Sequence, residues 1–391
     1  MLNTSLSPWP SFTQEEADAV SKVLLSNKVN YWTGTECREF EKEFAAFAGT
    51  QYAVALSNGT LALDVALKAM GIGAGDDVIV TSRTFLASAS CIVTAGANPV
   101  FADVDLNSQN ISAETIKAVL TPNTKAIIVV HLAGMPAEMD GIMDLAKEHD
   151  LWVIEDCAQA HGAKYKGKSV GSIGHVGAWS FCQDKIMTTG GEGGMVTTND
   201  KELWSKMWSY KDHGKSYDAV YHREHAPGFR WLHESFGTNW RMMEMQAVIG
   251  RIQLKRMPEW TARRQAHAAK LAESLGKFAG IRLIEIADYI EHAQYKFYAF
   301  VKPEHLKDGW TRDRIVSELN ARKVPCYQGS CSEVYLEKAF DNTPWRPKER
   351  LKNAVELGDT SLMFLVHPTL TDDEIAFCKE HIEAVLAEAT A

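Results

Sequence analysis

The sequence predicts an α/β protein: a mainly parallel seven-stranded sheet with flanking helices, followed by a smaller C-terminal α+β domain. Between about residues 50 and 200, short β-rich runs alternate with helical patterns, which is typical of parallel sheets. Most of these runs are almost continuously apolar, as expected for strands that are covered on both faces. After residue 200 the alternation ends, which favours a change of architecture.

Seven runs have the length and composition of strands, and four helical patterns separate the first five of them. The expected strands are YAVALS (52–57), DVIVTS (77–82), PVFADVD (99–105), AIIVVHL (126–132), WVIEDC (152–157), GAWSFC (177–182) and GMVTTN (194–199). The expected helices cover residues 60–71, 85–96, 112–120 and 139–150. In such a sheet, ligands bind at the carboxyl ends of the strands.

The C-terminal part is expected to contain more helix. A long helical pattern covers residues 239–278 and is expected to be interrupted near Pro258. Strand patterns at IRLIEI and YKFYAFVKP follow, then a helix and a terminal helix with an acidic first turn. We therefore divide the chain into a large domain with its N-terminal segment (1–255) and a small domain (256–391). Residues 212–237 lack periodicity, and a long loop in a compact protein is often functional.

Composition excludes several classes of protein. The 391 residues carry a net charge of -9, so nucleic acid is not an expected partner. The seven cysteines are odd in number and scattered, which favours reduced thiols and a cytoplasmic location. The N-terminus lacks the pattern of a signal peptide, and no apolar run approaches the ~20 residues of a membrane helix, so no membrane partner is expected.

Three features at the ends of expected strands could form one site. Asp156 ends an apolar strand, where a buried carboxylate needs a cation. Lys185 follows the next strand, and the sequence SNGT (57–60) could hold a phosphate at a helix N-terminus. Together these groups are what pyridoxal 5'-phosphate (PLP) requires: a Schiff-base lysine, an acid for the ring nitrogen and a phosphate cup. Taken singly, each could equally be a turn former, a solvated surface lysine or a plain helix cap.

Longer motifs add a family resemblance. EDCAQAHGA followed by GAWSFCQDKIMTTGGEGGM resembles the DegT-type sugar-nucleotide aminotransferases, which belong to fold type I of the PLP enzymes. The runs AVALSNGTLALDVAL, TFLASASCIVTAGANPVFADVD and GTNWRMMEMQAVIG agree in the expected order, so the resemblance covers most of the chain. It implies a PLP enzyme with a nucleotide-sugar substrate and an amino-acid donor, most simply L-glutamate.

The resemblance assigns roles residue by residue. Lys185 matches the Schiff-base lysine, which also acts as general acid and base, and Asp156 matches the partner of the ring nitrogen. The remaining matches are to cofactor contacts: Gln159 and Phe85 beside the ring, Gly59, Thr60 and Ser180 at the phosphate, and Asn239 lent to the phosphate by a neighbouring subunit. A lent residue implies a homodimer with shared active sites. Core packing for Phe85 and a turn for Asn239 are the alternatives.

The substrate is less closely defined by the motifs. Members with histidine in place of the lysine are dehydratases, so Lys185 favours a transaminase. The run TTGGEGG is one glycine longer than the commoner spacing. It resembles the longer run of family members that aminate UDP-linked 4-keto-6-deoxy N-acetyl sugars, and this resemblance favours amination at C4 of such a sugar. GDP- or dTDP-linked 3- or 4-keto-sugars are the alternative, as is a PLP-binding regulator without catalysis. Lipopolysaccharide, capsule, glycan and antibiotic pathways all use such enzymes.

Five further residues could line the sugar-nucleotide cleft or be merely structural: Trp32, Arg83, Arg230, Tyr327 and His367. No metal site is expected, because the histidines of HREH (222–225) have no second cluster with ligand spacing.

Overall fold

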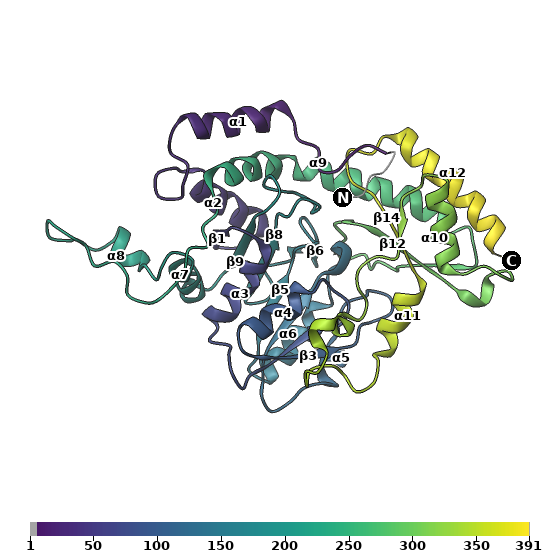
Figure 1. Ribbon diagram of the computed structural model, residues 1–391, viewed down its shortest axis with the longest axis horizontal. Helices are drawn as coiled ribbons and strands as arrows, with labels where there is room; N and C mark the ends of the chain where they lie inside the picture. The colour runs from purple at the N-terminus through teal and green to yellow at the C-terminus, as the bar shows by residue number, and fades with distance from the viewer. Residues whose placement is uncertain (1–5, 391) are drawn as a thin grey trace.

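A seven-stranded sheet forms the centre of the computed structural model, which describes residues 6–390 (Figure 1). The strand order is β1-β9-β8-β5-β4-β2-β3. β9 is antiparallel to β1 and β8, and the other neighbours pair in parallel, so the predicted mainly parallel sheet is confirmed. The strands are β1 (Tyr52–Leu56), β2 (Asp77–Thr81), β3 (Asn98–Ala102), β4 (Thr124–Val130), β5 (Trp152–Asp156), β8 (Val176–Ser180) and β9 (Gly194–Thr198).

Helices cover both faces of this sheet, which explains why its strands are almost continuously apolar. Val78 and Val80 of β2 share a buried cluster with residues of α3, α4 and α7. Ile79, between them, belongs to a cluster with residues of α5 and α6 on the other face. The helices of this part are α1 (Gln14–Leu25), α2 (Glu36–Ala48), α3 (Gly59–Ala69), α4 (Ala87–Thr94), α5 (Ala113–Lys117), α6 (Met139–Glu148), α7 (Lys201–Tyr210) and α8 (Tyr217–Tyr221).

Helix α9 (Glu244–Leu275) is 32 residues long and continues through Pro258, so the expected interruption there is wrong. A proline inside a helix costs about 3 kcal/mol because it removes a hydrogen bond and crowds the preceding turn. Packing against α1, α2 and the C-terminal helix α12 (Asp372–Ala389) outweighs that cost. Figure 1 shows α9 passing from the large sheet to the C-terminal part. It crosses residues 255 and 256 without a break, and the division of the chain at that point stays a prediction.

The C-terminal part has its own antiparallel sheet, ordered β10-β12-β14-β13, with a separate apolar cluster, so the predicted α+β character is confirmed. No helix among residues 6–390 is long and apolar enough to cross a membrane. The strands are β10 (Ile281–Leu283), β12 (Phe297–Val301), β13 (Cys326–Tyr327) and β14 (Ser361–Phe364), and the helices are α10 (Arg312–Ala321), α11 (Lys352–Thr360) and α12 (Asp372–Ala389). A third sheet joins β6 (Lys164–Tyr165), β7 (Lys168–Ser169) and β11 (Ile290–Glu291), and the 3₁₀ helices are η1 (Leu132–Gly134), η2 (Pro303–His305), η3 (Val334–Leu336) and η4 (Lys338–Phe340).

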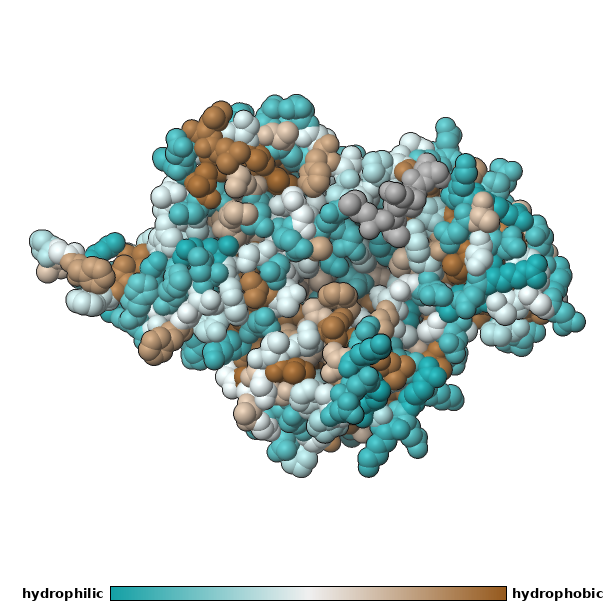
Figure 2. Space-filling model, viewed as in Figure 1, coloured by the Kyte–Doolittle hydropathy of each residue, from teal (hydrophilic) through white to brown (hydrophobic). Residues whose placement is uncertain are grey.

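The non-periodic stretch 212–237 forms an arm that projects from the body of the molecule and contains only the short helix α8 (Figure 1). Phe229, Trp231 and Phe236 on this arm are largely exposed. Apolar surface also gathers over α1, where Leu24 and Leu25 are exposed (Figure 2).

Glu155, the residue before the end of β5, is fully buried and ties several loops to the sheet. Its carboxylate accepts backbone N–H bonds from Gly171, Ile173 and Gly174 at 2.6–2.8 Å. His131 Nε2 lies 2.9 Å away, and its Nδ1 accepts the Ala137 N–H, so the Nε2–H donates to Glu155. Burial raises the pKa of Glu155, but the bonds from His131 and the backbone outweigh burial and hold that pKa below its ordinary value.

Replacing Glu155 with Gln should lower the free energy of unfolding in urea at pH 7 by about 3 kcal/mol, because buried donors lose a charged acceptor. A depressed pKa stabilises the fold above the ordinary value of 4.5, and this contribution is lost as the pH falls. The difference from wild type should therefore shrink in acid. The control is Glu148→Gln on the exposed end of α6, which should change stability by less than about 0.5 kcal/mol. Equal stability of E155Q and wild type at pH 7 would contradict this account.

Candidate active site

The predicted site residues lie at the carboxyl edge of the large sheet. Asp156 is the last residue of β5 and Ser180 is the last residue of β8. These strands are parallel neighbours, and Asp156 pairs with Ala178, two residues before Ser180. Gly59, at the start of α3, follows β1. The fold therefore brings together groups from three strands that are distant in the sequence.

Asp156 is a buried carboxylate with neutral hydrogen-bond partners. The Ser88 hydroxyl donates to Oδ2 at 2.8 Å, and the Ala158 N–H donates to Oδ1 at 3.1 Å. Burial raises the pKa of Asp156, although both hydrogen bonds and the charge of Lys185 oppose the rise. A cationic ring N–H placed against Asp156 would favour its ionised form. Ser88 was missed by the motif reading, although it lies one helical turn after Phe85 in TFLASAS.

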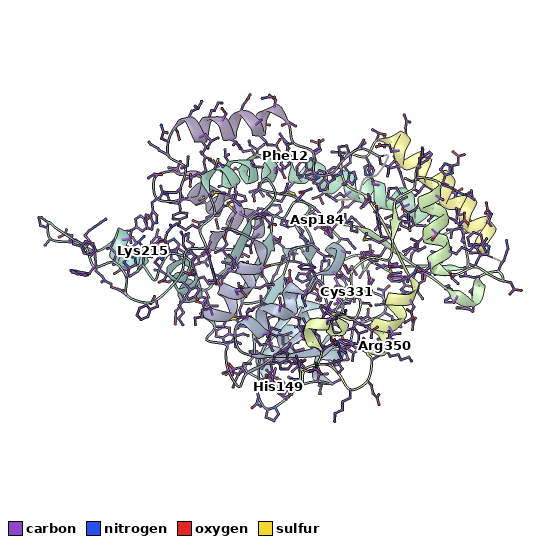
Figure 3. All side chains as sticks on the ribbon, viewed as in Figure 1. Phe12, His149, Asp184, Lys215, Cys331 and Arg350 are labelled. Carbon is purple, nitrogen blue, oxygen red and sulfur yellow. The ribbon has the colours of Figure 1, made fainter. Side chains whose placement is uncertain are left out.

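Lys185 lies in the loop after β8, with its side chain only 17% exposed. Its Nζ is 3.7 Å from Asp184 Oδ1 and 5.5 Å from the centroid of the Tyr295 ring. The Tyr295 hydroxyl in turn donates to Asp184 Oδ2 at 2.5 Å. Asp184 lies near the middle of the molecule, where the large sheet approaches the C-terminal part (Figure 3).

Two aromatic residues that the sequence motifs did not indicate contact the Lys185 loop. The Tyr295 ring centroid lies 5.5 Å from the Lys185 Nζ. Trp9 donates its indole N–H to the Lys185 carbonyl oxygen at 2.9 Å. Both are more than 100 positions from Lys185 in the sequence, so no local pattern could have indicated them.

The phosphate cup predicted from the sequence lies at the start of α3. Asn58 caps the helix by accepting the Leu61 N–H at 3.0 Å. The first N–H groups of the helix have no partner within it and can meet an anion. Gly59 packs so closely on Ser180 that a Cβ atom built on it would lie 2.5 Å from the Ser180 Cβ. Only glycine therefore leaves this approach open, and Thr60 beside it is exposed.

Phe85 and Gln159 are both linked to Asp156 by short stretches of chain: Phe85 through Ser88, and Gln159 through the turn that follows β5. Phe85 is 70% exposed, and its carbonyl oxygen accepts the N–H of Ser88, the residue that bonds Asp156. An apolar ring this exposed, three residues before the serine that bonds Asp156, would suit a flat ring stacked on it. The Gln159 Oε1 accepts the Ala133 N–H at 2.8 Å, which holds Ala133 in a left-handed conformation (φ 57°).

Asn239 is exposed and forms an isolated antiparallel bridge with Asp212, and the carbonyl oxygen of the next residue, Trp240, accepts the Ser57 N–H. Among residues 6–390 its side chain has no hydrogen-bond partner. Its contact with a neighbouring subunit's phosphate stays a prediction, like the other assigned roles.

The five possible cleft residues are not brought together. Arg83 is fully buried and bonds Gln109 and Ser361 with its guanidinium, so it joins β2 to the C-terminal part. Arg230 lies exposed on the arm and Trp32 packs against Trp208. Tyr327 lies partly buried on β13, and His367 stacks on Trp9.

The arrangement fits PLP in charge and shape. Lys185 supplies an amine, and Asp156 supplies a carboxylate that accepts hydrogen bonds from neutral donors. The close contact of Gly59 with Ser180 leaves a space that a Cβ atom would fill. Seven strands in this order, with these groups at their carboxyl edge, define a PLP-dependent enzyme of fold type I. The model of the DegT/DnrJ/EryC1/StrS aminotransferase family matches residues 10–383, and the chain belongs to this family. It is a PLP-dependent sugar-nucleotide aminotransferase.

Individual relatives agree with this assignment. The X-ray structure of an aminotransferase from Psychrobacter cryohalolentis is 66% identical, with a TM-score of 0.96 over 98% of this chain and 99% of that one. The UDP-N-acetyl-3-dehydro-alpha-D-glucosamine 3-aminotransferase of Acidithiobacillus ferrooxidans is 42% identical over 91% of this chain and 90% of its own. The GDP-perosamine synthase of Caulobacter vibrioides is 41% identical over 72% and 73%.

Replacing Gly59 with Ala should weaken PLP binding about tenfold or more, because the new methyl group must push Ser180 out of the cup. Absorbance titration of the apoenzyme with PLP measures this affinity. The matched control is Gly73→Ala, whose Cβ would meet its nearest atom at an ordinary 3.7 Å and should leave the affinity unchanged. Equal affinities of the two variants would argue against a phosphate at this cup.

Proposed function

We propose that this enzyme transfers an amino group from L-glutamate to C4 of a UDP-linked 4-keto-6-deoxy N-acetyl sugar. The observation that carries the amino transfer is the position of Lys185, whose amine lies between Asp184 and the Tyr295 ring, at the same sheet edge as Asp156. Seven cysteines, all unpaired, support a cytoplasmic site of action, where thiols stay reduced.

Each side chain has a distinct task in this proposal. When bound, PLP supplies an electron sink that stabilises the charge left when a C–H bond next to nitrogen breaks. Asp156 would hold the proton on the ring nitrogen. Lys185, once its amine is free, would take the proton from the donor's α-carbon and give it to the carbon on the other side of the transferred nitrogen. Asp184 and Tyr295 orient the Lys185 amine between the carbon that loses the proton and the carbon that receives it.

The run TTGGEGG supports the choice of sugar. Gly190 and Gly191 both have positive φ angles, 90° and 127° respectively. Residues other than glycine rarely adopt this backbone conformation. A Cβ on Gly190 would lie 2.9 Å from Ile249, whereas one on Gly191 meets nothing within 4 Å. The longer run thus shapes the backbone that follows Lys185 in the sequence, and Gly191 forms a bridge with Cys182. The similarity to a GDP-perosamine synthase favours a GDP-linked sugar as the second candidate.

We further propose that the enzyme works as a homodimer whose subunits share their active sites. Three observations support a second copy: the unpaired and exposed side chain of Asn239, the projecting arm with its exposed aromatic side chains, and the apolar surface over α1 (Figure 2).

The yellow PLP-loaded protein should lose its visible absorbance on addition of L-glutamate and regain it with the UDP-linked 4-keto sugar. Spectrophotometry measures both half-reactions, and a panel with GDP- and dTDP-linked 3- and 4-keto sugars ranks the acceptors by rate. Lys185→Ala should abolish both changes, because the residue that moves the proton is absent. A wild-type protein that no amino donor bleaches would refute the aminotransferase proposal. Preference for a GDP-linked acceptor would overturn only the choice of sugar.

Mixing two inactive variants tests whether the sites are shared. Lys185→Ala and Asn239→Ala homodimers, unfolded together and refolded, should recover about a quarter of wild-type activity at limiting PLP. Half of the random dimers are then mixed, and each mixed dimer has one intact site of two. If light scattering shows that dimers have formed but no activity is recovered, Asn239 acts in the active site of its own subunit.

A further inference from the structure

Arg264 on α9 is a buried cation that has no anionic partner in the part of the chain that the structure describes. Its side chain is 1% exposed, and its Nε and Nη2 atoms have no hydrogen-bond partner among the described residues. The one bond is from Nη1 to the Tyr295 carbonyl oxygen at 3.4 Å. Burial lowers the pKa of Arg264 to about 9. A buried charge costs several kcal/mol unless an anion meets it, so an unpaired guanidinium here needs a reason.

A second cation, Lys296, lies beside it. The Lys296 Nζ is 4.8 Å from the centroid of the Tyr295 ring, and the Lys185 Nζ is 5.5 Å from the same centroid. Burial, together with the charges of Arg264 and Lys185, lowers the pKa of Lys296 to about 8, although Asp184 raises it. Asp184 is already engaged by Lys185 and Tyr295. Positive charge is therefore in excess on this side of the site.

Aromatic rings lie next to these cations and connect them to the loop of Lys185. The Arg264 guanidinium carbon lies 5.0 Å from the centroid of the Trp9 ring. Trp9 stacks on His367 at 6.0 Å and bonds the Lys185 carbonyl oxygen. Burial and the charges of Arg264 and Lys296 lower the pKa of His367 to about 3, so this imidazole is neutral at pH 7.

We propose that Arg264 and Lys296 form the subsite that binds a carboxylate of the amino donor, which rests on the aminotransferase function proposed above. The free Nε and Nη2 of a guanidinium match the two oxygens of a carboxylate. Closeness to Lys185 selects the donor over the sugar nucleotide. A donor's carboxylate is one bond from the carbon that bears the amine, whereas the phosphates of a nucleotide sugar are separated from C4 by the width of the sugar ring.

Glutarate, a dicarboxylate that has no amine and cannot react, is the probe for this subsite. Calorimetric titration of the PLP-loaded protein should show that Arg264→Gln and Lys296→Gln each weaken glutarate binding about tenfold or more, since each removes a charged hydrogen bond. Binding of UDP should change less than about twofold in both variants. Lys255→Gln, which removes an exposed charge from the same helix, is the matched control and should bind glutarate like wild type.

Three outcomes would overturn the subsite: no glutarate binding to wild type, wild-type glutarate affinity in a folded variant of either residue, or loss of UDP instead of glutarate affinity. If Arg264→Gln does not fold by circular dichroism, Lys296→Gln and Arg264→Lys carry the test, and the latter should restore part of the affinity. Because glutarate and UDP binding need no turnover, these results are distinguishable from failure of the aminotransferase proposal, which the bleaching of wild-type protein by L-glutamate decides.

Discussion

Glu155 and Asp156, the last two residues of β5, face opposite sides of the large sheet. The rest of the site depends on the different hydrogen-bond partners of these two carboxylates. Glu155 is fully paired by His131 and three backbone N–H groups, so its charge belongs to the fold. Asp156 receives only two neutral donors and stays short of positive charge. Strand alternation separates the two carboxylates, so one anchors loops while the other remains for a ligand.

The positively charged residues of the site also lack a full set of partners of opposite charge. Within residues 6–390, Lys185 has one carboxylate within 4 Å, Lys296 lies close by, and Arg264 has two nitrogens without partners. The protein thus keeps unsatisfied charges of both signs in one region, at a cost in stability that only a bound charged ligand removes. Enzymes commonly accept such a cost where substrates must be held and protons moved.

The strands, their order along the chain, and the places of Asp156 and Lys185 could be predicted because they depend on local patterns: apolar runs, turn residues and motif spacing. The contacts of Tyr295 and Trp9 with the Lys185 loop could not, because they join segments more than 100 residues apart. The break expected at Pro258 was wrong for a related reason, since packing on three other helices outweighs a local preference. Residue types alone also could not show that Arg83 is enclosed rather than facing the cleft.

The N-terminal segment acts as a short tether between two parts of the molecule. Ser7 bonds Glu374 on α12, and two residues later Trp9 bonds the carbonyl oxygen of Lys185. Two residues span at most about 7 Å when fully extended. Any swing of α12 away from the large sheet must therefore break one of these bonds or pull on the backbone that carries the reactive amine. For this reason, a change in the distance between the two parts of the chain also changes the position of Lys185.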